Sequence, residues 1–153
     1  MLIPFTVKAH GARRGMPYNN YSEQVLEHFN NPRNVGRLDK DDPRVGTGVA
    51  QDPAKGDLIR FQVMVDEQGR IVDARFKAYG CGSAIASASA LTTLIIGRTV
   101  SEAEQPCHAE IMRLLDLPPE KKAYAALAEE ALLSALADHA RKHQRTAARQ
   151  PEP

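Results

Sequence analysis

The stretch from residue 58 to residue 97 decides the fold, because its periodicity changes once: "LIRFQVMVDEQGRIVDARFKAYGCGSAIASASALTTLIIG". In residues 58–66 apolar and polar side chains alternate, as in a strand with one buried face. The alternation returns in residues 70–80 after the turn "EQG", so the two segments predict an antiparallel hairpin with one face in water. From Ser83 small and apolar residues follow one another, which predicts a buried helix closed by Gly97.

The alternation assigns side chains to the two faces of the hairpin. Polar side chains, among them Arg60, Gln62 and Asp66, are expected to face water. The side chains expected on the other, buried face are Ile59, Phe61, Val63, Val65, Val72, Ala74, Phe76 and Ala78.

The flanking segments complete an α+β domain with a small antiparallel three-stranded sheet and helices packed on one face. Residues 46–51 ("GTGVAQ") predict the third strand. A short helix is predicted after Asn20, with Glu23 completing a capping box and Asn31-Pro32 ending it. Ser101 with Glu104 repeats the capping signature before "EAE" (102–104). A short amphipathic helix is predicted over 109–117, and the last helix is expected from Glu120 to His143.

Composition excludes several classes of protein. The chain has 153 residues and a formal net charge of +1, which gives no general case for a nucleic-acid or membrane partner. Two cysteines are too few for a disulfide-stapled secreted fold, so a cytoplasmic location is expected. We predict a flexible extension over 1–19, one domain over 20–143 and a flexible polar tail over 144–153, with Met16 as an alternative start.

Cys81 lies where a strand gives way to a helix, between Gly80 and Gly82. A helix N-terminus carries a partial positive charge that favours thiolate, and the glycines allow a bulky group to approach. These features suit a sulfur nucleophile or a metal ligand; the alternative is a thiol that merely packs. Asp57 is a plausible neighbour across the sheet edge, but two ligands are fewer than the four of a tetrahedral site.

The other candidate side chains point to ordinary structural roles. Cys107 and His108 are adjacent, and neighbouring residues seldom converge on one ion, so a loop at a helix start is expected there. His28, His139 and His143 occur in highly charged helical segments and are expected to be solvated.

Four segments together resemble the IscU/NifU-type iron–sulfur cluster assembly scaffolds: "YSEQVLEHFNNPRNVG", "DPAKGD", "VDARFKAYGCGSAIASASALT" and "LDLPPEKKAYAALAEEAL". The likeness covers about residues 20 to 143, in order. The resemblance implies a non-enzymatic scaffold that receives sulfur from a cysteine desulfurase, builds a two-iron two-sulfur cluster and passes it to recipient apo-proteins. It also implies a heat-shock chaperone that reads a Leu-Pro-Pro-Val-Lys motif, whose counterpart here is Leu117, Pro118, Pro119, Glu120 and Lys121.

The chain departs from the family at the ligands. Family members hold the cluster or a zinc ion through three cysteines, with an aspartate or histidine nearby. The first cysteine position is Lys55, and the histidine and third cysteine positions are Ala123 and Tyr124. Only Cys81 and Asp57 remain, so a single chain cannot hold a cluster in the family's way, and whether it holds any cluster or zinc is open.

Several interpretations follow from this departure. If residues 55–57 are extended, Lys55 and Asp57 share a side, so that the ammonium could take the charge role of a metal while Tyr124 fills the volume. Drift after loss of function is the alternative. A homodimer that pairs Cys81 and Asp57 of both chains would supply four ligands.

For function, we predict cluster or sulfur transfer through Cys81. The alternative is a module that binds no metal, docks a desulfurase or chaperone and modulates the true scaffold. A thiol catalyst ranks last, since no histidine base is positioned by the sequence.

Overall fold

The computed structural model describes residues 21–149, with side chains up to Gln144. The predicted α+β fold is confirmed. The elements in chain order are α2 (Glu23–Asn30), β1 (Val45–Gln51), β2 (Leu58–Val65), β3 (Ile71–Tyr79), α3 (Gly82–Ile95), α4 (Val100–Ala103), α5 (His108–Leu115), the short 3-10 helix η2 (Pro119–Lys121) and α6 (Lys122–Arg149). The extension over 1–19 lies outside the described residues, and the domain boundaries stay a prediction.

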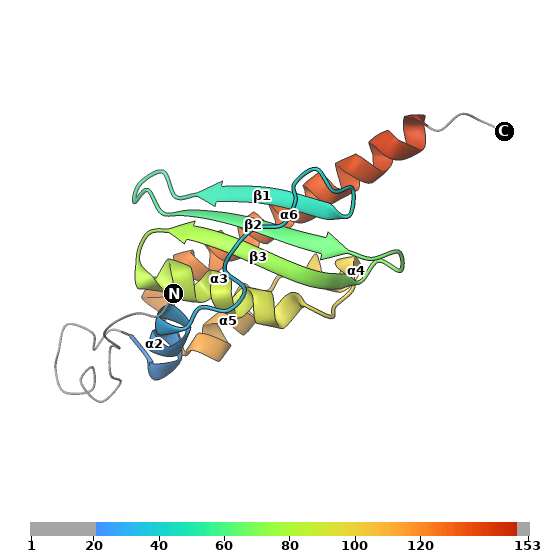
Figure 1. Cartoon of the computed structure of the whole chain (residues 1–153). Helices are drawn as coiled ribbons and strands as arrows, with labels where there is room; N and C mark the ends of the chain where they lie inside the picture. Colours follow the sequence, from blue (N-terminus) through green and yellow to red (C-terminus); the bar gives the residue numbers. More distant parts are fainter. Residues whose placement is uncertain (1–20, 150–153) are drawn as a thin grey trace.

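The sheet is antiparallel in the order β1-β2-β3 (Figure 1). The pairing of β2 with β3 slips between Met64 and Val65, so that Val65 pairs with Ile71. This bulge reverses the alternation at the start of β3. Ile71 is therefore buried and Val72 is 48% exposed, which corrects the prediction that Val72 faces the core.

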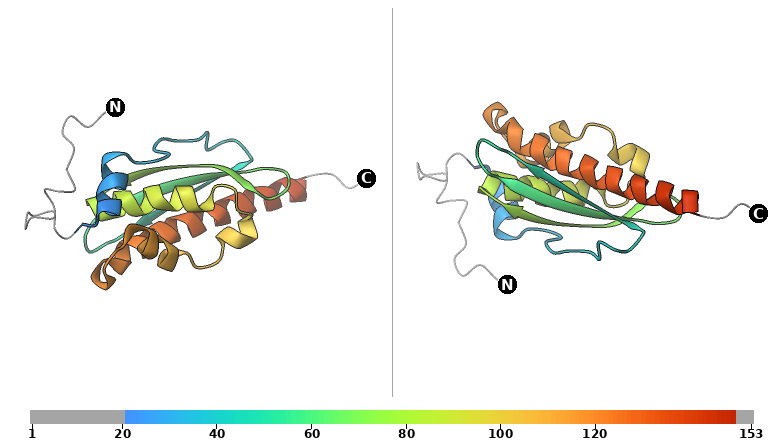
Figure 2. Two further views of the ribbon diagram at one scale, coloured as in Figure 1. Left: turned by 90° about the horizontal axis from the view of Figure 1, so that it is seen from below. Right: turned by 90° about the horizontal axis from the view of Figure 1, so that it is seen from above.

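Helices α3 and α6 cover the same face of the sheet, and the hydrophobic core lies between the layers (Figure 2). Helix α6 lies on β1 and β2, whereas α3 lies mainly on β3. Strand β1 has two glycines where α6 passes: a Cβ atom on Gly48 would lie 2.3 Å from the Ala135 backbone nitrogen. A Cβ on Gly46 would lie 2.9 Å from the Cβ of His139. The missing side chains therefore allow the helix to approach the strand closely.

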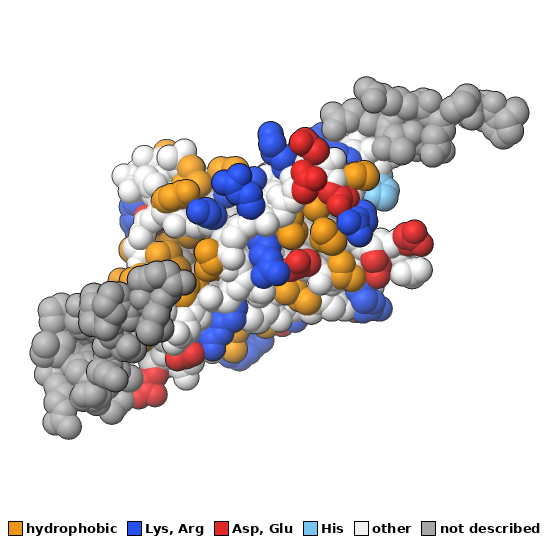
Figure 3. Space-filling view, in the orientation of Figure 1, with side chains coloured by type: hydrophobic (Ala, Val, Ile, Leu, Met, Phe, Trp, Pro, Cys, Tyr) orange, Lys and Arg blue, Asp and Glu red, His pale blue; other side chains and the backbone are white. Residues whose placement is uncertain are grey.

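The second face of the sheet is covered in part by the segment 31–44, which crosses in front of it (Figure 1). Val35 forms a parallel bridge with Phe76. Gln62 is buried beneath this segment, where its amide bonds the backbone of Leu38 and the Thr47 hydroxyl. The expectation that Gln62 faces water was wrong, because a covering loop leaves no alternating signal in the strand. Figure 3 shows apolar and basic side chains interspersed on this face.

Two helix starts differ from those predicted. Ser22 caps α2 by accepting from the Val25 backbone N–H, whereas the predicted cap, Asn20, lies outside the described residues. Thr99 and Glu102 form the capping box of α4, two residues before the predicted Ser101. Ser22 and Thr99 could each be recognised as possible caps in the sequence, but other residues nearby are equally good N-cap residues. Helix α6 continues to Arg149, past its predicted end at His143.

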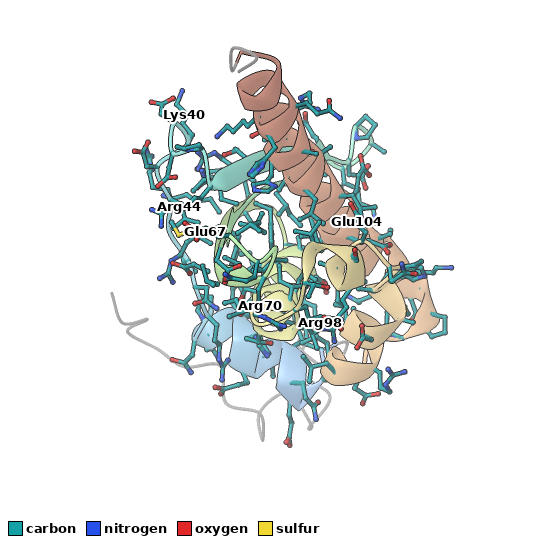
Figure 4. The ribbon with its side chains drawn as sticks, turned by 90° about the vertical axis from the view of Figure 1, so that its right-hand side faces the viewer. Lys40, Arg44, Glu67, Arg70, Arg98 and Glu104 are labelled. Carbon is teal, nitrogen blue, oxygen red and sulfur yellow. The ribbon has the colours of Figure 1, made fainter. Side chains whose placement is uncertain are left out.

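At the end of the sheet where β2 turns into β3, the turn is hydrogen-bonded to the segment that follows α3. There the Ile71 N–H donates to the Arg98 carbonyl, and Val100 N–H donates to the Gly69 carbonyl. Arg98 also forms an ion pair with Glu110 at 2.9 Å. Figure 4 shows Arg70 and Arg98 at this end of the molecule. Within residues 21–149, no helix is long and apolar enough to cross a bilayer.

Gly48→Ala is expected to destabilise the fold, because the new methyl group would overlap the α6 backbone. Overpacking of this kind costs about 1–3 kcal/mol in free energy of unfolding. Denaturant titration followed by circular dichroism measures the change. Val49→Ala is the matched control, because Val49 is 49% exposed on the same strand, and it should change the free energy by less than about 0.5 kcal/mol. Equal effects of the two variants would contradict the packing described.

Candidate functional site

Cys81 caps the N-terminus of α3, directly after the end of β3. Its backbone is extended (φ −79°, ψ 171°), and its carbonyl accepts from the N–H groups of Ala84 and Ile85. The thiol makes no capping bond and is half-buried, so it remains available at the positive end of a fourteen-residue helix. The local sequence explains this, because Gly80 takes the positive φ of 151° that turns the chain from strand to helix.

Asp57 lies beside Cys81, at the start of β2. Its side chain is only 7% exposed, and Oδ2 lies 3.9 Å from Cys81 Sγ. The other oxygen lies over the Gly80 backbone: a Cβ on Gly80 would be 2.2 Å from Oδ1. The structure therefore brings together Cys81 and Asp57, the two ligand positions that the sequence retains. The absence of a side chain on Gly80 makes room for the carboxylate.

Lys55 pairs with Tyr124 rather than with Asp57. Lys55 Nζ donates to the Tyr124 hydroxyl at 3.2 Å and lies 4.7 Å from the centre of its ring. The hydrogen bond with Tyr124 is the main reason that the Lys55 pKa is raised, and Asp57 contributes least. The expected extended geometry fails because residues 53–55 form a turn and Gly56 has a φ of +81°.

Tyr124 connects this lysine to the thiol. Cys81 is the largest cause of a raised Tyr124 pKa, and Lys55 acts in the opposite direction. The phenol therefore stays protonated at neutral pH and can donate toward sulfur. Tyr124 thus bonds Lys55, which stands at another replaced ligand position, and lies within electrostatic reach of Cys81. Ala123, at the remaining replaced position, is exposed.

A second lysine–tyrosine pair links η2 to the chain just before α2. Lys121 Nζ lies 4.6 Å from the centre of the Tyr21 ring. The pKa of Tyr21 is raised, first by burial and then by Cys81 and Tyr124, which places its hydroxyl within electrostatic reach of both. Sequence reasoning missed Tyr21, because an aromatic residue just before a helix carries no signal of what it faces.

Lys121 belongs to the segment Leu117–Lys121, which links α5 to α6. Leu117 is buried, whereas Pro119 and Glu120 are exposed. The chain turns into this segment at Asp116, which has a left-handed backbone (φ 52°). One end of the predicted chaperone motif is thus anchored in the core and its middle lies on the surface, while Lys121 reaches the Tyr21 ring.

Cys107 and His108 lie apart from this site and are held by Glu129 of α6. One Glu129 oxygen accepts from the Cys107 backbone N–H at 2.8 Å, and the other lies 2.9 Å from His108 Nδ1. Burial, followed by the nearby carboxylates Glu129 and Glu110, raises the pKa of the Cys107 thiol to about 12. The pair is an ordinary helix start, as the sequence indicated, and Glu129 is the cap that sequence reasoning missed.

Two of the three histidines expected to be solvated are not. His28 lies against α3, where its Nδ1 is 2.7 Å from the Ser89 hydroxyl. His139 is 8% exposed, because Gly46 lets α6 press it against β1, and its ring lies 4.3 Å from that of His143. Burial is the main cause of a lowered pKa at both His28 and His139. Only His143 is exposed as expected.

The donor set at Cys81 does not fit a metal of the family's kind. Among the described residues, no group of three or more His, Cys, Asp or Glu side chains could hold an ion together. Cys81 and Asp57 supply two donors, whereas a tetrahedral site takes four. A protonated lysine has no lone pair to offer, so Lys55 cannot complete the set.

Fold and site together define an α+β domain that presents one accessible thiol, Cys81, next to a buried carboxylate and two lysine–tyrosine pairs. The sequence profile of the NifU-like N-terminal domain family matches residues 20–146, and the chain belongs to this family. The iron–sulfur cluster assembly scaffold protein IscU of Azotobacter vinelandii is 52% identical over 122 residues, which cover 80% of this chain and 95% of that protein.

A second relative supports the family, and a solved structure supports the fold. The iron–sulfur cluster assembly enzyme IscU of Drosophila melanogaster is 48% identical over 135 residues, or 88% of each chain. A crystal structure of a putative iron–sulfur cluster assembly scaffold protein for the SUF system, from Fervidobacterium islandicum AW-1, superposes with a TM-score of 0.65. That match covers 79% of this chain and 99% of the other at 19% identity, and it supports the fold.

The two thiols should differ in reactivity in the folded protein. With its pKa raised to about 12 and its side chain buried, Cys107 has almost no reactive thiolate at mildly alkaline pH. Iodoacetamide is therefore expected to alkylate Cys81 alone, and both cysteines once the chain is unfolded in guanidinium. Peptide mass spectrometry identifies the modified residue. Comparable labelling of both cysteines in the folded state would contradict the burial of Cys107.

Proposed function

We propose that this chain acts in iron–sulfur cluster assembly as a scaffold-like protein that carries sulfur or a cluster through Cys81. The observation that supports this most is the position of Cys81, half-buried at the start of α3 with Asp57 Oδ2 at 3.9 Å. Relatives that are about half identical to the chain carry the name of cluster assembly scaffolds. The cluster is cargo in this proposal, and the chain keeps only part of a ligand set for it.

The chemical step is a sulfur transfer without net oxidation. The Cys81 thiolate attacks the outer sulfur of a persulfide on a cysteine desulfurase, and a new sulfur–sulfur bond forms as the old one breaks. The desulfurase cysteine leaves as a thiolate, and the proton stays on the transferred sulfur. One disulfide-type bond replaces another, so no external oxidant or reductant is needed.

The role proposed is that of a carrier rather than a catalyst. Three histidines that could serve as a base are engaged elsewhere: His28 with Ser89, His108 with Glu129 and His139 with His143. Recipient apo-proteins and a heat-shock chaperone are the further partners of this proposal. The exposed part of Leu117–Lys121 is the surface offered to the chaperone.

Sulfur loading tests the proposal directly. The reduced protein is incubated anaerobically with a cysteine desulfurase and cysteine, and its intact mass is measured. The wild type and Cys107→Ala should each gain one sulfur atom, whereas Cys81→Ser should gain none. Cys107→Ala is the matched control, since it removes the chain's other thiol.

Circular dichroism of Cys81→Ser should match the wild type, because the half-buried thiol makes no capping bond. Failure of the wild type to gain sulfur would overturn the proposal, and so would normal loading of the folded Cys81→Ser protein.

A further inference from the structure

Two lysine–tyrosine pairs have their phenols within electrostatic reach of the one accessible thiol of the chain. Lys55 reaches Tyr124 from the turn before β2, and Lys121 reaches Tyr21 from η2. Cys81 raises the pKa of both tyrosines, which places the two phenols within electrostatic reach of its sulfur. The four side chains come from three segments of the chain, since Lys121 and Tyr124 both lie at the junction of η2 and α6, so their convergence depends on the tertiary fold.

This arrangement provides positive charge and donors where the family has metal ligands. Lysine is charged and tyrosine is protonated at neutral pH. Lys55 occupies the first cysteine position and Tyr124 the third, and the two side chains bond each other at 3.2 Å. Asp57 is the one carboxylate against Cys81 Sγ, at 3.9 Å, and it is buried. The surroundings of the sulfur therefore combine one negative group with two cations and two hydroxyl groups.

We propose that the Lys55–Tyr124 pair replaces the metal ion at this site and positions the anionic sulfur of Cys81, so that Cys81 accepts sulfur from a persulfide without a bound metal. This inference rests on the proposed function. The ligand class is a sulfur anion: the thiolate before transfer and, once the transferred sulfur has released its proton to solvent, the persulfide anion after it. Tyr124 donates its hydroxyl proton to that anion in a hydrogen bond, and Lys55 supplies the compensating charge through Tyr124.

The geometry favours an anion over a metal ion for a simple reason. Lys55 and Asp57 are within electrostatic reach of each other, so a cation bound between Cys81 and Asp57 would be repelled by the Lys55 ammonium. A sulfur anion meets the opposite situation, because each added negative charge is attracted by Lys55 and Lys121. Lys55 and Tyr124 are positioning residues, since both act on the sulfur that reacts and neither bonds to the transferred atom.

A small persulfide tests the inference apart from any protein partner. Reduced protein is treated with EDTA and then with glutathione persulfide, and the initial rate of sulfur gain at Cys81 is followed by intact mass. Removal of metal should leave the wild-type rate unchanged. Lys55→Met and Tyr124→Phe should each lower the rate about fivefold, as expected for loss of one partly solvated charge or charge-assisted hydrogen bond.

Matched variants separate charge from structure. Lys55→Arg keeps the cation and should recover most of the rate, whereas Lys122→Met removes an exposed neighbouring charge and should leave the rate unchanged. Alkylation of Cys81 gives a second readout, through the ratio of rates with anionic iodoacetate and neutral iodoacetamide. Lys55→Met should lower this ratio, whereas general loosening of the site would raise both rates together.

The outcomes distinguish the two proposals. Equal loading of wild type and Lys55→Met, or wild-type loading that requires added zinc, would overturn the inference and leave the proposed function standing. If glutathione persulfide loads Cys81 in a Lys55-dependent manner but a cysteine desulfurase does not load it, the proposed function fails although the sulfur-binding chemistry is present.

Discussion

The close approach of α6 to β1 is the constraint on which the rest of the structure depends. It is possible because Gly46 and Gly48 leave the strand bare where the helix crosses it, and a methyl group on Gly48 would overlap the helix backbone. The same helix carries Tyr124 to the thiol site and Glu129 to the start of α5. One packing contact thus fixes both the core and the side chain that replaces a ligand.

Much of the fold could be predicted because the local signals agree with one another. The strand alternation, the small-residue helix after Cys81 and the α+β class all followed from periodicity. The side chains whose burial was predicted wrongly have a common cause. The bulge that reverses Val72, the loop that buries Gln62 and the helix contact that buries His139 are all set by a second segment. Periodicity within one segment carries no information about these contacts.

The residues of the candidate site could be predicted from the sequence, but the contacts between them could be predicted less well. Cys81, Asp57, Lys55 and Tyr124 could all be singled out from the sequence, and the structure places them in one cluster. The expected Lys55–Asp57 pair depended on an extended backbone, which the turn at residues 53–55 removes. Lys121 was singled out only as part of the chaperone motif, and its contact with Tyr21 could not be predicted because it joins the chain before α2 to the α5–α6 connection.

The central claim is that Lys55 and Tyr124 now occupy the place of a metal ion, and zinc binding tests it most directly. Reduced wild type and the triple variant Lys55→Cys/Ala123→His/Tyr124→Cys are titrated with zinc against a colorimetric chelator. We expect the triple variant to bind one zinc ion per chain, because its donors join Cys81 and Asp57, and the wild type to bind none at this site. Stoichiometric zinc binding by the wild type that is lost in Cys81→Ser would contradict the account.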